Sequence, residues 1–239
     1  MNSVLSKIIH TIYPSRCVFC RTYSENKQNL CDLCKTSLPW SVDRCYRCGL
    51  GLEKHTETIL CDRCQTFPPH FDRLCSIFSY QPPVKALITG LKFSNRLDYG
   101  RVLSTLLAEG VNDWYYENGL PGLTLPEAII PMPLHWKRHQ RRGFNQAMEL
   151  SREVERKFSL PVLIKECARI THTKAQARLS AHRRAANLQN AFRVQLQKPY
   201  QHVAIVDDVV TTGSTVNALS LALKQQGVLN IDVWCICRA

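Results

Sequence analysis

Over residues 72–239, short apolar runs alternate with segments in which apolar residues recur at helical spacing. The runs predicted as strands are 76–80, 128–132, 167–170, 202–206 and 231–237. The segments predicted as helices are 83–92, 97–116, 144–158 and 214–225. Strands that alternate with helices typically form a mainly parallel sheet covered on both faces. We therefore expect an α/β domain over residues 71–239, with ligands bound at the carboxyl ends of its strands.

Residues 14–70 lack this periodicity and are mostly polar between their cysteines. Eight cysteines form four Cys-x-x-Cys pairs: Cys17/Cys20, Cys31/Cys34, Cys45/Cys48 and Cys61/Cys64. Each pair can direct two sulfurs at one ion, and two pairs complete a tetrahedron of thiolates around zinc. A single pair could equally be a redox site, but four pairs without a βαβ pattern favour two zinc sites. The sequence thus predicts a small N-terminal zinc-ribbon domain over residues 1–70.

The spacing of the pairs leaves open which pairs share an ion. Consecutive grouping joins the first pair to the second and the third to the fourth, which gives two zinc ribbons; interleaved grouping is the alternative. Thiolates fill every ligand position in both cases, so we expect closed, structural sites rather than catalytic ones. Zinc sites of this kind supply about 10–16 kcal/mol of apparent folding free energy, enough to order a segment without an apolar core.

A helical stripe of apolar residues precedes the first cysteine, formed by Val4, Leu5, Ile8, Ile9 and Ile12. Packing against the rest of the protein is the simpler interpretation, and a helix on a membrane surface is the alternative. Nothing approaches the roughly 18 consecutive apolar residues of a transmembrane helix, and the first residues do not resemble a secretion signal. We therefore expect a cytoplasmic protein without a transmembrane segment.

Positive charge is concentrated in one fifth of the chain. The formal net charge is +12, and residues 137–184 hold 13 Lys and Arg against 4 Asp and Glu, a net of +9. Such a concentration favours a partner rich in phosphate. Solvated helix faces with no specific role are the alternative.

The predicted strand 202–206 leads directly into a chemically specific segment. Two adjacent acids, Asp207 and Asp208, are followed by Thr211, Thr212, Gly213, Ser214 and Thr215, and then by a predicted helix. Glycine permits a tight backbone path whose successive N–H groups form a concave anion site. The N-terminus of the following helix and the hydroxyl groups strengthen that site. The segment therefore predicts a site for a single phosphate, with two carboxylates beside it for sugar hydroxyls or a divalent cation.

This acid pair with the Thr-Thr-Gly-Ser-Thr segment resembles the motif by which type I phosphoribosyltransferases bind phosphoribosyl pyrophosphate (PRPP). The resemblance implies that Asp207 and Asp208 contact the ribose hydroxyls and that residues 211–215 hold the 5′-phosphate. A basic loop after the predicted strand 128–132 is then expected to hold the pyrophosphate, because forked guanidinium groups suit its oxygens. The candidates in that loop are Lys137, Arg141, Arg142 and Gly143.

A third polar and basic segment, residues 169–187, lies between predicted strands. It resembles the mobile hood loop that closes over bound PRPP in this fold and excludes water while pyrophosphate leaves. Its candidate contacts are Thr173, Lys174, Gln176 and Arg184. The resemblance implies that Mg²⁺ accompanies the PRPP.

These motifs, in this order, resemble the ComF/GntX family of bacterial competence and DNA-utilisation proteins. The shared features are the paired Cys-x-x-Cys modules, Leu91-Lys-Phe93, Pro131-Met-Pro133, Arg142-Gly-Phe-Asn-Gln146, Thr173-x-x-Gln176-x-x-Leu179, Arg184-x-x-Asn187 and Val206–Thr215. The resemblance covers essentially the whole chain. It implies a double zinc ribbon followed by a type I phosphoribosyltransferase domain, and a role in natural transformation or the use of external DNA.

Three functions are compatible with this resemblance. The first is magnesium-dependent transfer of phosphoribose from PRPP to an unidentified acceptor. The second is a non-catalytic competence factor that binds single-stranded DNA and uses PRPP or a nucleotide only as a regulatory ligand. In either, the inner-membrane DNA-uptake machinery is the expected protein partner. The third is a transferase fold that serves only as a docking scaffold.

Overall fold

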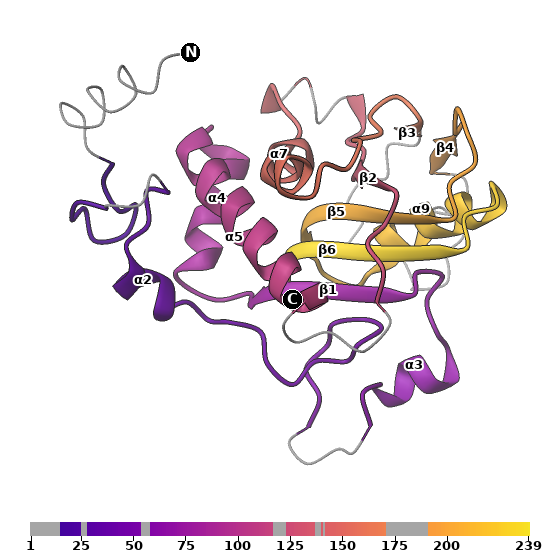
Figure 1. Cartoon of the computed structure of the whole chain (residues 1–239), viewed down its shortest axis with the longest axis horizontal. Helices are drawn as coiled ribbons and strands as arrows, with labels where there is room; N and C mark the ends of the chain where they lie inside the picture. The colour runs from indigo at the N-terminus through magenta and orange to yellow at the C-terminus, as the bar shows by residue number, and fades with distance from the viewer. Residues whose placement is uncertain are drawn as a thin grey trace, which may run out of the picture.

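Four parallel strands form the central sheet of the protein, in the order β1 (Arg73–Ser79), β6 (Asn230–Arg238), β5 (His202–Val210) and β2 (Ala128–Pro131) (Figure 1). The structure is a computed structural model that describes residues 15–24, 28–53, 58–116, 123–136, 140, 142–170 and 191–239. Asp207 of β5 is level with Cys235 of β6, and Pro131 of β2 is level with Val206 of β5. The strands therefore end together at one edge, and the predicted parallel α/β sheet is confirmed.

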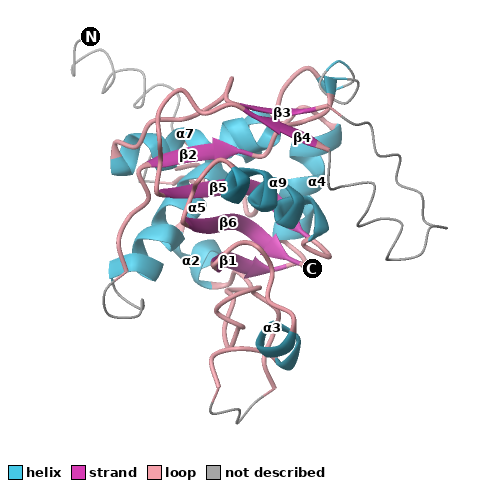
Figure 2. Ribbon diagram, turned by 90° about the vertical axis from the view of Figure 1, so that its right-hand side faces the viewer, coloured by secondary structure: helices cyan, strands magenta, loops and turns pink. Residues whose placement is uncertain are grey.

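Helices cover both faces of this sheet. The helices α4 (Val84–Phe93), α5 (Leu97–Tyr116) and α7 (Gln146–Phe158) pack on one face, where their apolar residues share a core with Val206 and Trp234. The helix α9 (Ser214–Gln225) packs on the other face, over Val203, Ile205 and Val233 (Figure 2). Because alternate residues of β5 enter opposite cores, the strand is buried on both sides and is apolar almost throughout.

The N-terminal cysteine segments pack against this α/β unit at two places. Leu30 and Leu38 join the core around α5, and Glu109 of α5 accepts from Gln28 at 3.0 Å and pairs with Lys35 at 2.9 Å. The short helix α2 (Asp32–Thr36) belongs to this first segment. The zinc-ribbon segments thus lie on the α/β unit as packed layers and are not held by a linker alone.

The second cysteine segment lies beyond β1, with its helix α3 (Asp62–Thr66) at the far end (Figure 2). The Tyr46 carbonyl accepts from the backbone N–H of Leu74 at 3.1 Å. The Cys48 carbonyl accepts from the buried guanidinium of Arg238 at 2.9 Å. These bonds fix the segment to the amino end of β1 and to the carboxyl end of β6.

A buried polar cluster around Asp232 links the amino ends of β1, β5 and β6. The Asp232 carboxylate is fully buried and accepts from Arg73 of β1 and from Tyr115 of α5, and the His202 ring of β5 lies 2.9 Å from it. These partners satisfy a charge that burial alone would make costly. The sequence analysis did not identify this cluster, because its members are far apart along the chain.

Several elements differ from the predicted ones by more than one residue, and β1 begins at Arg73 instead of 76. β5 extends to Val210 instead of ending at 206, since Val209 and Val210 still pair with β6. Helix α7 begins at Gln146 rather than 144. The predicted strand 167–170 belongs to a separate antiparallel hairpin of β3 (Cys167–Arg169) and β4 (Phe192–Val194), and β4 was not predicted. The apolar stripe over residues 4–12 lies outside the described residues.

Candidate phosphate site and zinc centres

The loop between β5 and α9 contains the residues of the predicted anion site. Gly213 is the N-cap of α9 and has φ of 78°, a conformation that side chains with a Cβ resist. As a glycine it also places no side chain over the first N–H groups of the helix, which carry the positive end of the helix dipole. Thr212 and Ser214 are exposed, and their hydroxyl oxygens are 2.8 Å apart. The loop therefore presents N–H and O–H donors together to solvent.

Asp207 and Asp208 lie near the end of β5, and Val209 and Val210 separate them from this loop. One carboxylate oxygen of Asp207 accepts from the N–H of Asp208 at 2.9 Å, and one of Asp208 accepts from the N–H of Val209 at 2.6 Å. The second oxygen of Asp208 pairs with Lys92 of α4 at 2.9 Å. Backbone hydrogen bonds thus orient both side chains, and Lys92 already contacts the outer oxygen of Asp208.

The environment of Asp207 favours its protonated form. Burial, together with the charge of the adjacent Asp208, raises the pKa of Asp207 to about 7, and the cations Lys92 and Arg169 only partly oppose the rise. Both forms of the carboxyl group are then populated near neutral pH. A ligand that donates hydrogen bonds or brings a cation will draw Asp207 to its charged form.

A cavity of about 200 Å³ joins the acid pair to the phosphate loop. Its walls include residues 207–215, the loop after β2 and three cations, Lys92, Arg142 and Arg169. The three cations come from α4, from the loop before α7 and from β3. The site is therefore polar and carries positive charge opposite two carboxylates, an arrangement that suits a phosphorylated sugar.

The basic loop after β2 meets the prediction only in part. Arg142 lines the cavity and donates to Gln146 at 3.0 Å, while its guanidinium lies 5.5 Å from the centre of the Phe93 ring. Gly143 has φ of 77° and lies outside the cavity lining. Lys137 and Arg141 lie outside the described residues, as do Thr173, Lys174, Gln176 and Arg184 of the expected hood segment.

Asn145 closes this loop, a role that the sequence analysis missed. Its side-chain oxygen accepts from the N–H of Ala147 and caps α7, while its amide donates to the Met132 carbonyl at 3.1 Å. The two ends of the loop are thereby tied together beside the cavity. Asn directly before a helical pattern is a recognisable cap signal, but only the fold shows its second bond.

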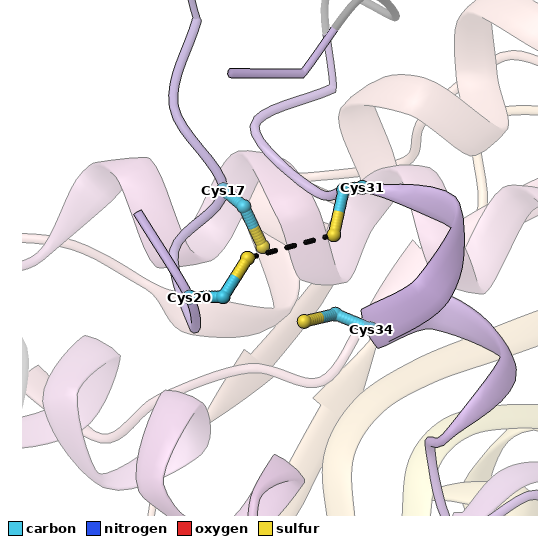
Figure 3. A group of neighbouring side chains, drawn as sticks. All are labelled: Cys17, Cys20, Cys31 and Cys34. Atoms are coloured by element: carbon cyan, nitrogen blue, oxygen red, sulfur yellow. Dashed lines mark hydrogen bonds between the residues drawn. The ribbon is translucent and has the colours of Figure 1, made fainter. Parts of the chain in front are cut away.

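Four cysteine sulfurs converge in the first zinc ribbon, from Cys17, Cys20, Cys31 and Cys34 (Figure 3). All four lie within 4.8 Å of one another, and those of Cys20 and Cys31 are 3.6 Å apart. Zn–S bonds of about 2.3 Å in a tetrahedron separate the sulfurs by about 3.8 Å, so the cluster fits zinc and is too open for disulfides. A hydrogen bond from the Thr22 hydroxyl lowers the pKa of Cys20 to about 6, which favours the thiolate that zinc requires.

The second ribbon repeats this arrangement with Cys45, Cys48, Cys61 and Cys64. The sulfurs of Cys48 and Cys61 are 3.7 Å apart. The consecutive grouping of the pairs is therefore correct, and the interleaved grouping is wrong. All four ligand positions in each cluster are cysteines, which fits closed structural sites as expected.

None of the helices in the described part of the chain combines the length and apolarity needed to cross a membrane. The model of the double zinc ribbon domain family matches residues 8–65.

Three relatives are similar to this chain over nearly the whole length of both sequences. Competence protein F of Haemophilus influenzae is 40% identical, over 94% of this chain and 97% of the relative. DNA utilization protein YhgH is 37% identical in Escherichia coli K12 and 36% identical in Salmonella typhimurium, with the same coverage of both chains.

Solved structures give a weaker likeness. A purine phosphoribosyltransferase from Pyrococcus horikoshii is 17% identical, with a TM-score of 0.31 over 59% of this chain and 72% of that chain. A hypoxanthine phosphoribosyltransferase from Trypanosoma cruzi is 15% identical, with a TM-score of 0.32 over 60% of this chain and 74% of that chain. These values are low, and the likeness carries no conclusion about function.

Proposed function

This chain belongs to the family of competence protein F and DNA utilization protein YhgH, and we propose that it is a phosphoribosyltransferase-like protein that binds PRPP and acts in the uptake and use of external DNA. The second half of the proposal rests on the names of these relatives. The first half rests on one observation: a single cavity contains both the acid pair and the phosphate loop.

The proposed position of PRPP follows from the donors and acceptors around this cavity. The 5′-phosphate binds to the N–H groups and hydroxyls of residues 211–215, at the N-terminus of α9. The ribose hydroxyls donate to the outer oxygens of Asp207 and Asp208. The pyrophosphate then lies toward Arg142, whose forked guanidinium matches its oxygens.

Mg²⁺ is the expected companion of the PRPP, because a divalent cation neutralises the charge of the departing pyrophosphate. Carboxylate oxygens are the ligands that this ion prefers, so the acid pair fits it. The protein's own part in a transfer is to hold the sugar by its 5′-phosphate and to stabilise the leaving group through Arg142. The bond from the anomeric carbon to the pyrophosphate oxygen breaks, and the acceptor supplies the new electron pair.

The second hypothesis is a non-catalytic competence factor for which PRPP or a nucleotide is a regulatory ligand. Both hypotheses require the same phosphate loop, and they differ in whether pyrophosphate is released. In both, the proposed place of action is the cytoplasm, where incoming single-stranded DNA would meet the protein beside the inner-membrane uptake machinery.

Titration of the zinc-loaded protein with PRPP in the presence of Mg²⁺ tests the proposal. We expect saturable binding that weakens when inorganic phosphate or ribose 5-phosphate competes for the loop. Pyrophosphate release on incubation with PRPP, measured with and without nucleobases or single-stranded DNA, then separates a transferase from a regulatory binding protein. Absence of PRPP binding under all these conditions contradicts the proposed function.

A further inference from the structure

A second cavity, of about 410 Å³, lies on the other side of the phosphate loop from the acid pair. It lies between the second zinc ribbon and α9, and Arg63, Phe67, Asn217 and Leu221 contribute to its walls. Leu50, Phe71 and Ala218 are among the apolar residues that line it. The cavity therefore lies where the two parts of the protein meet.

The wall from the zinc ribbon carries an exposed aromatic ring and an exposed cation. Phe67 ends helix α3, and its side chain is 78% exposed although it is large and apolar. Arg63, one turn earlier, is exposed as well, and it makes no ion pair within the described part of the chain. An aromatic face beside an unpaired guanidinium is a suitable surface for a nucleobase and a nearby phosphate.

This wall is held in place before any ligand binds. Pro68 and Pro69 follow Phe67 and restrict the backbone, and the N–H of His70 donates to the Asn217 side chain of α9 at 2.6 Å. Arg47 also donates to the Pro69 carbonyl at 3.4 Å. A preformed wall lowers the conformational entropy that a ligand must overcome.

The charge of the lining favours an anionic occupant. Among the residues that line the cavity are two arginines and one histidine, and none is an aspartate or glutamate. The Arg238 guanidinium is buried and donates to backbone carbonyls, which leaves Arg63 and His70 as the accessible groups. This excess of positive charge favours a ligand that carries phosphate over an apolar peptide without acidic residues.

The two cavities share the phosphate loop as their common wall. Val210, Thr212, Gly213 and Ser214 line both of them. At Gly213 a Cβ would meet nothing closer than Val210 at 4.0 Å, so the space beside this residue is open. A phosphate bound there can carry one ester group into the first cavity and another into the second. A monoester such as PRPP uses only one of these directions, whereas a phosphodiester uses both.

We propose that the second cavity binds the preceding nucleoside of a single-stranded nucleic acid whose phosphodiester lies in the phosphate loop. The nucleoside on the 3′ side of that phosphate extends over the acid pair, and the base on the 5′ side stacks on Phe67. The inference rests on the proposed function only in using the same phosphate loop. A dinucleotide unit therefore competes with PRPP for this loop and contacts the zinc ribbon, which PRPP does not reach.

The test compares thymidine 5′-monophosphate, the dinucleotide TpT and PRPP as ligands of the zinc-loaded protein. We expect TpT to bind about tenfold more tightly than the mononucleotide, in keeping with one base stacked on an aromatic ring. Phe67→Ala should remove most of that advantage and leave PRPP affinity unchanged. Tyr23→Ala is the matched control, since Tyr23 is an aromatic residue of the first ribbon with 64% exposure.

Arg63→Ala should likewise weaken TpT binding severalfold, with Arg101→Ala on the exposed side of α5 as the charge-matched control. Equal affinities for TpT and the mononucleotide, or an equal loss for all three ligands in Phe67→Ala, would overturn the inference. If TpT binds and responds to Phe67→Ala while PRPP does not bind, the proposed function fails and this inference stands. If PRPP binds and TpT does not, this inference fails and the proposed function stands.

Discussion

The ammonium group of Lys92 lies 2.9 Å from a carboxylate oxygen of Asp208. This ion pair links the end of helix α4 to the end of strand β5, and both residues line the smaller cavity. The side chains retain only 21% and 12% exposure, respectively, so solvent screens the pair weakly. Lys92 therefore balances one of two adjacent carboxylates at the position where the proposed sugar hydroxyls bind.

Lys92→Met should destabilise the protein by about 2 kcal/mol, because it leaves the largely buried Asp208 carboxylate without its cation. PRPP affinity should fall about tenfold, since the site loses a positive charge beside the anionic ligand and Asp208 loses its ion pair. Lys92→Arg should recover most of the stability. The measurement is the urea dependence of unfolding at constant zinc and pH, together with PRPP titration.

Lys85→Met is the control for that substitution, because Lys85 lies on the exposed side of the same helix. Its effect on stability should be close to zero. Equal stabilities of Lys92→Met and Lys85→Met would contradict the role given to the ion pair.

Gly213→Ala should impair phosphate binding at a modest cost in stability. Its φ of 78° costs a residue with a Cβ about 1–2 kcal/mol, and relief of that strain would turn the N–H groups away from the ligand. Gly227→Ala is the matched control: Gly227 also has a positive φ, of 91°, and no atom lies near the added Cβ, but it follows the other end of α9. Both variants should lose similar stability in thermal unfolding, while only Gly213→Ala loses PRPP affinity, by more than tenfold.

Asp207→Asn should stabilise the protein increasingly as the pH rises from 5.5 to 8. The pKa of Asp207 is raised to about 7 by burial and by the charge of Asp208, so the folded state binds more protons than the unfolded state between about pH 4 and 7. Ionisation of Asp207 therefore lowers stability as pH rises, and the amide removes this loss, which is on the order of 2 kcal/mol over the interval from pH 5.5 to 8.

Asp98→Asn is the control, because the pKa of Asp98 is shifted in the opposite direction to that of Asp207. Its hydrogen bond from Arg96 lowers the pKa of Asp98, so ionised Asp98 adds stability that is present above its unfolded pKa and is lost in acid. That variant should be slightly less stable than the wild type at pH 8. A constant difference between Asp207→Asn and the wild type across this pH range would show that Asp207 titrates normally.

Double cysteine variants report the zinc grouping. Cys20→Ser with Cys31→Ser affects one cluster, and the purified protein should retain one zinc ion per chain. Cys20→Ser with Cys48→Ser affects both clusters, and both ions should be lost. Metal content by mass spectrometry under native conditions distinguishes these cases, and the reverse pattern would be the signature of interleaved pairs.

Features set by local sequence were predictable. The four cysteine pairs defined the two cysteine clusters, and the motif of the acid pair with Gly213 predicted a tight turn before α9, because each depends on residues within a few positions of one another. The helices α5 and α9 follow the predicted bounds of 97–116 and 214–225, since their apolar stripes are regular and uninterrupted.

Features that depend on distant residues were not predictable in the same way. Lys92 belongs to the Leu-Lys-Phe segment of the family resemblance, yet only the packing of α4 shows its contact with Asp208. Strand β4 contains three residues with an exposed Arg193 at its centre, too short for a periodic signal. The grouping of the cysteine pairs likewise required the path of the chain between them.

Calorimetric titration of PRPP with Mg²⁺ into the wild type and into the double variant Asp207→Asn, Asp208→Asn tests the central claim most directly. The amides keep the shape of the side chains and remove their charge. The account predicts saturable binding to the wild type and an affinity at least a hundredfold weaker in the variant, with two zinc ions per chain in both proteins. Equal PRPP affinity in the two proteins would contradict the site.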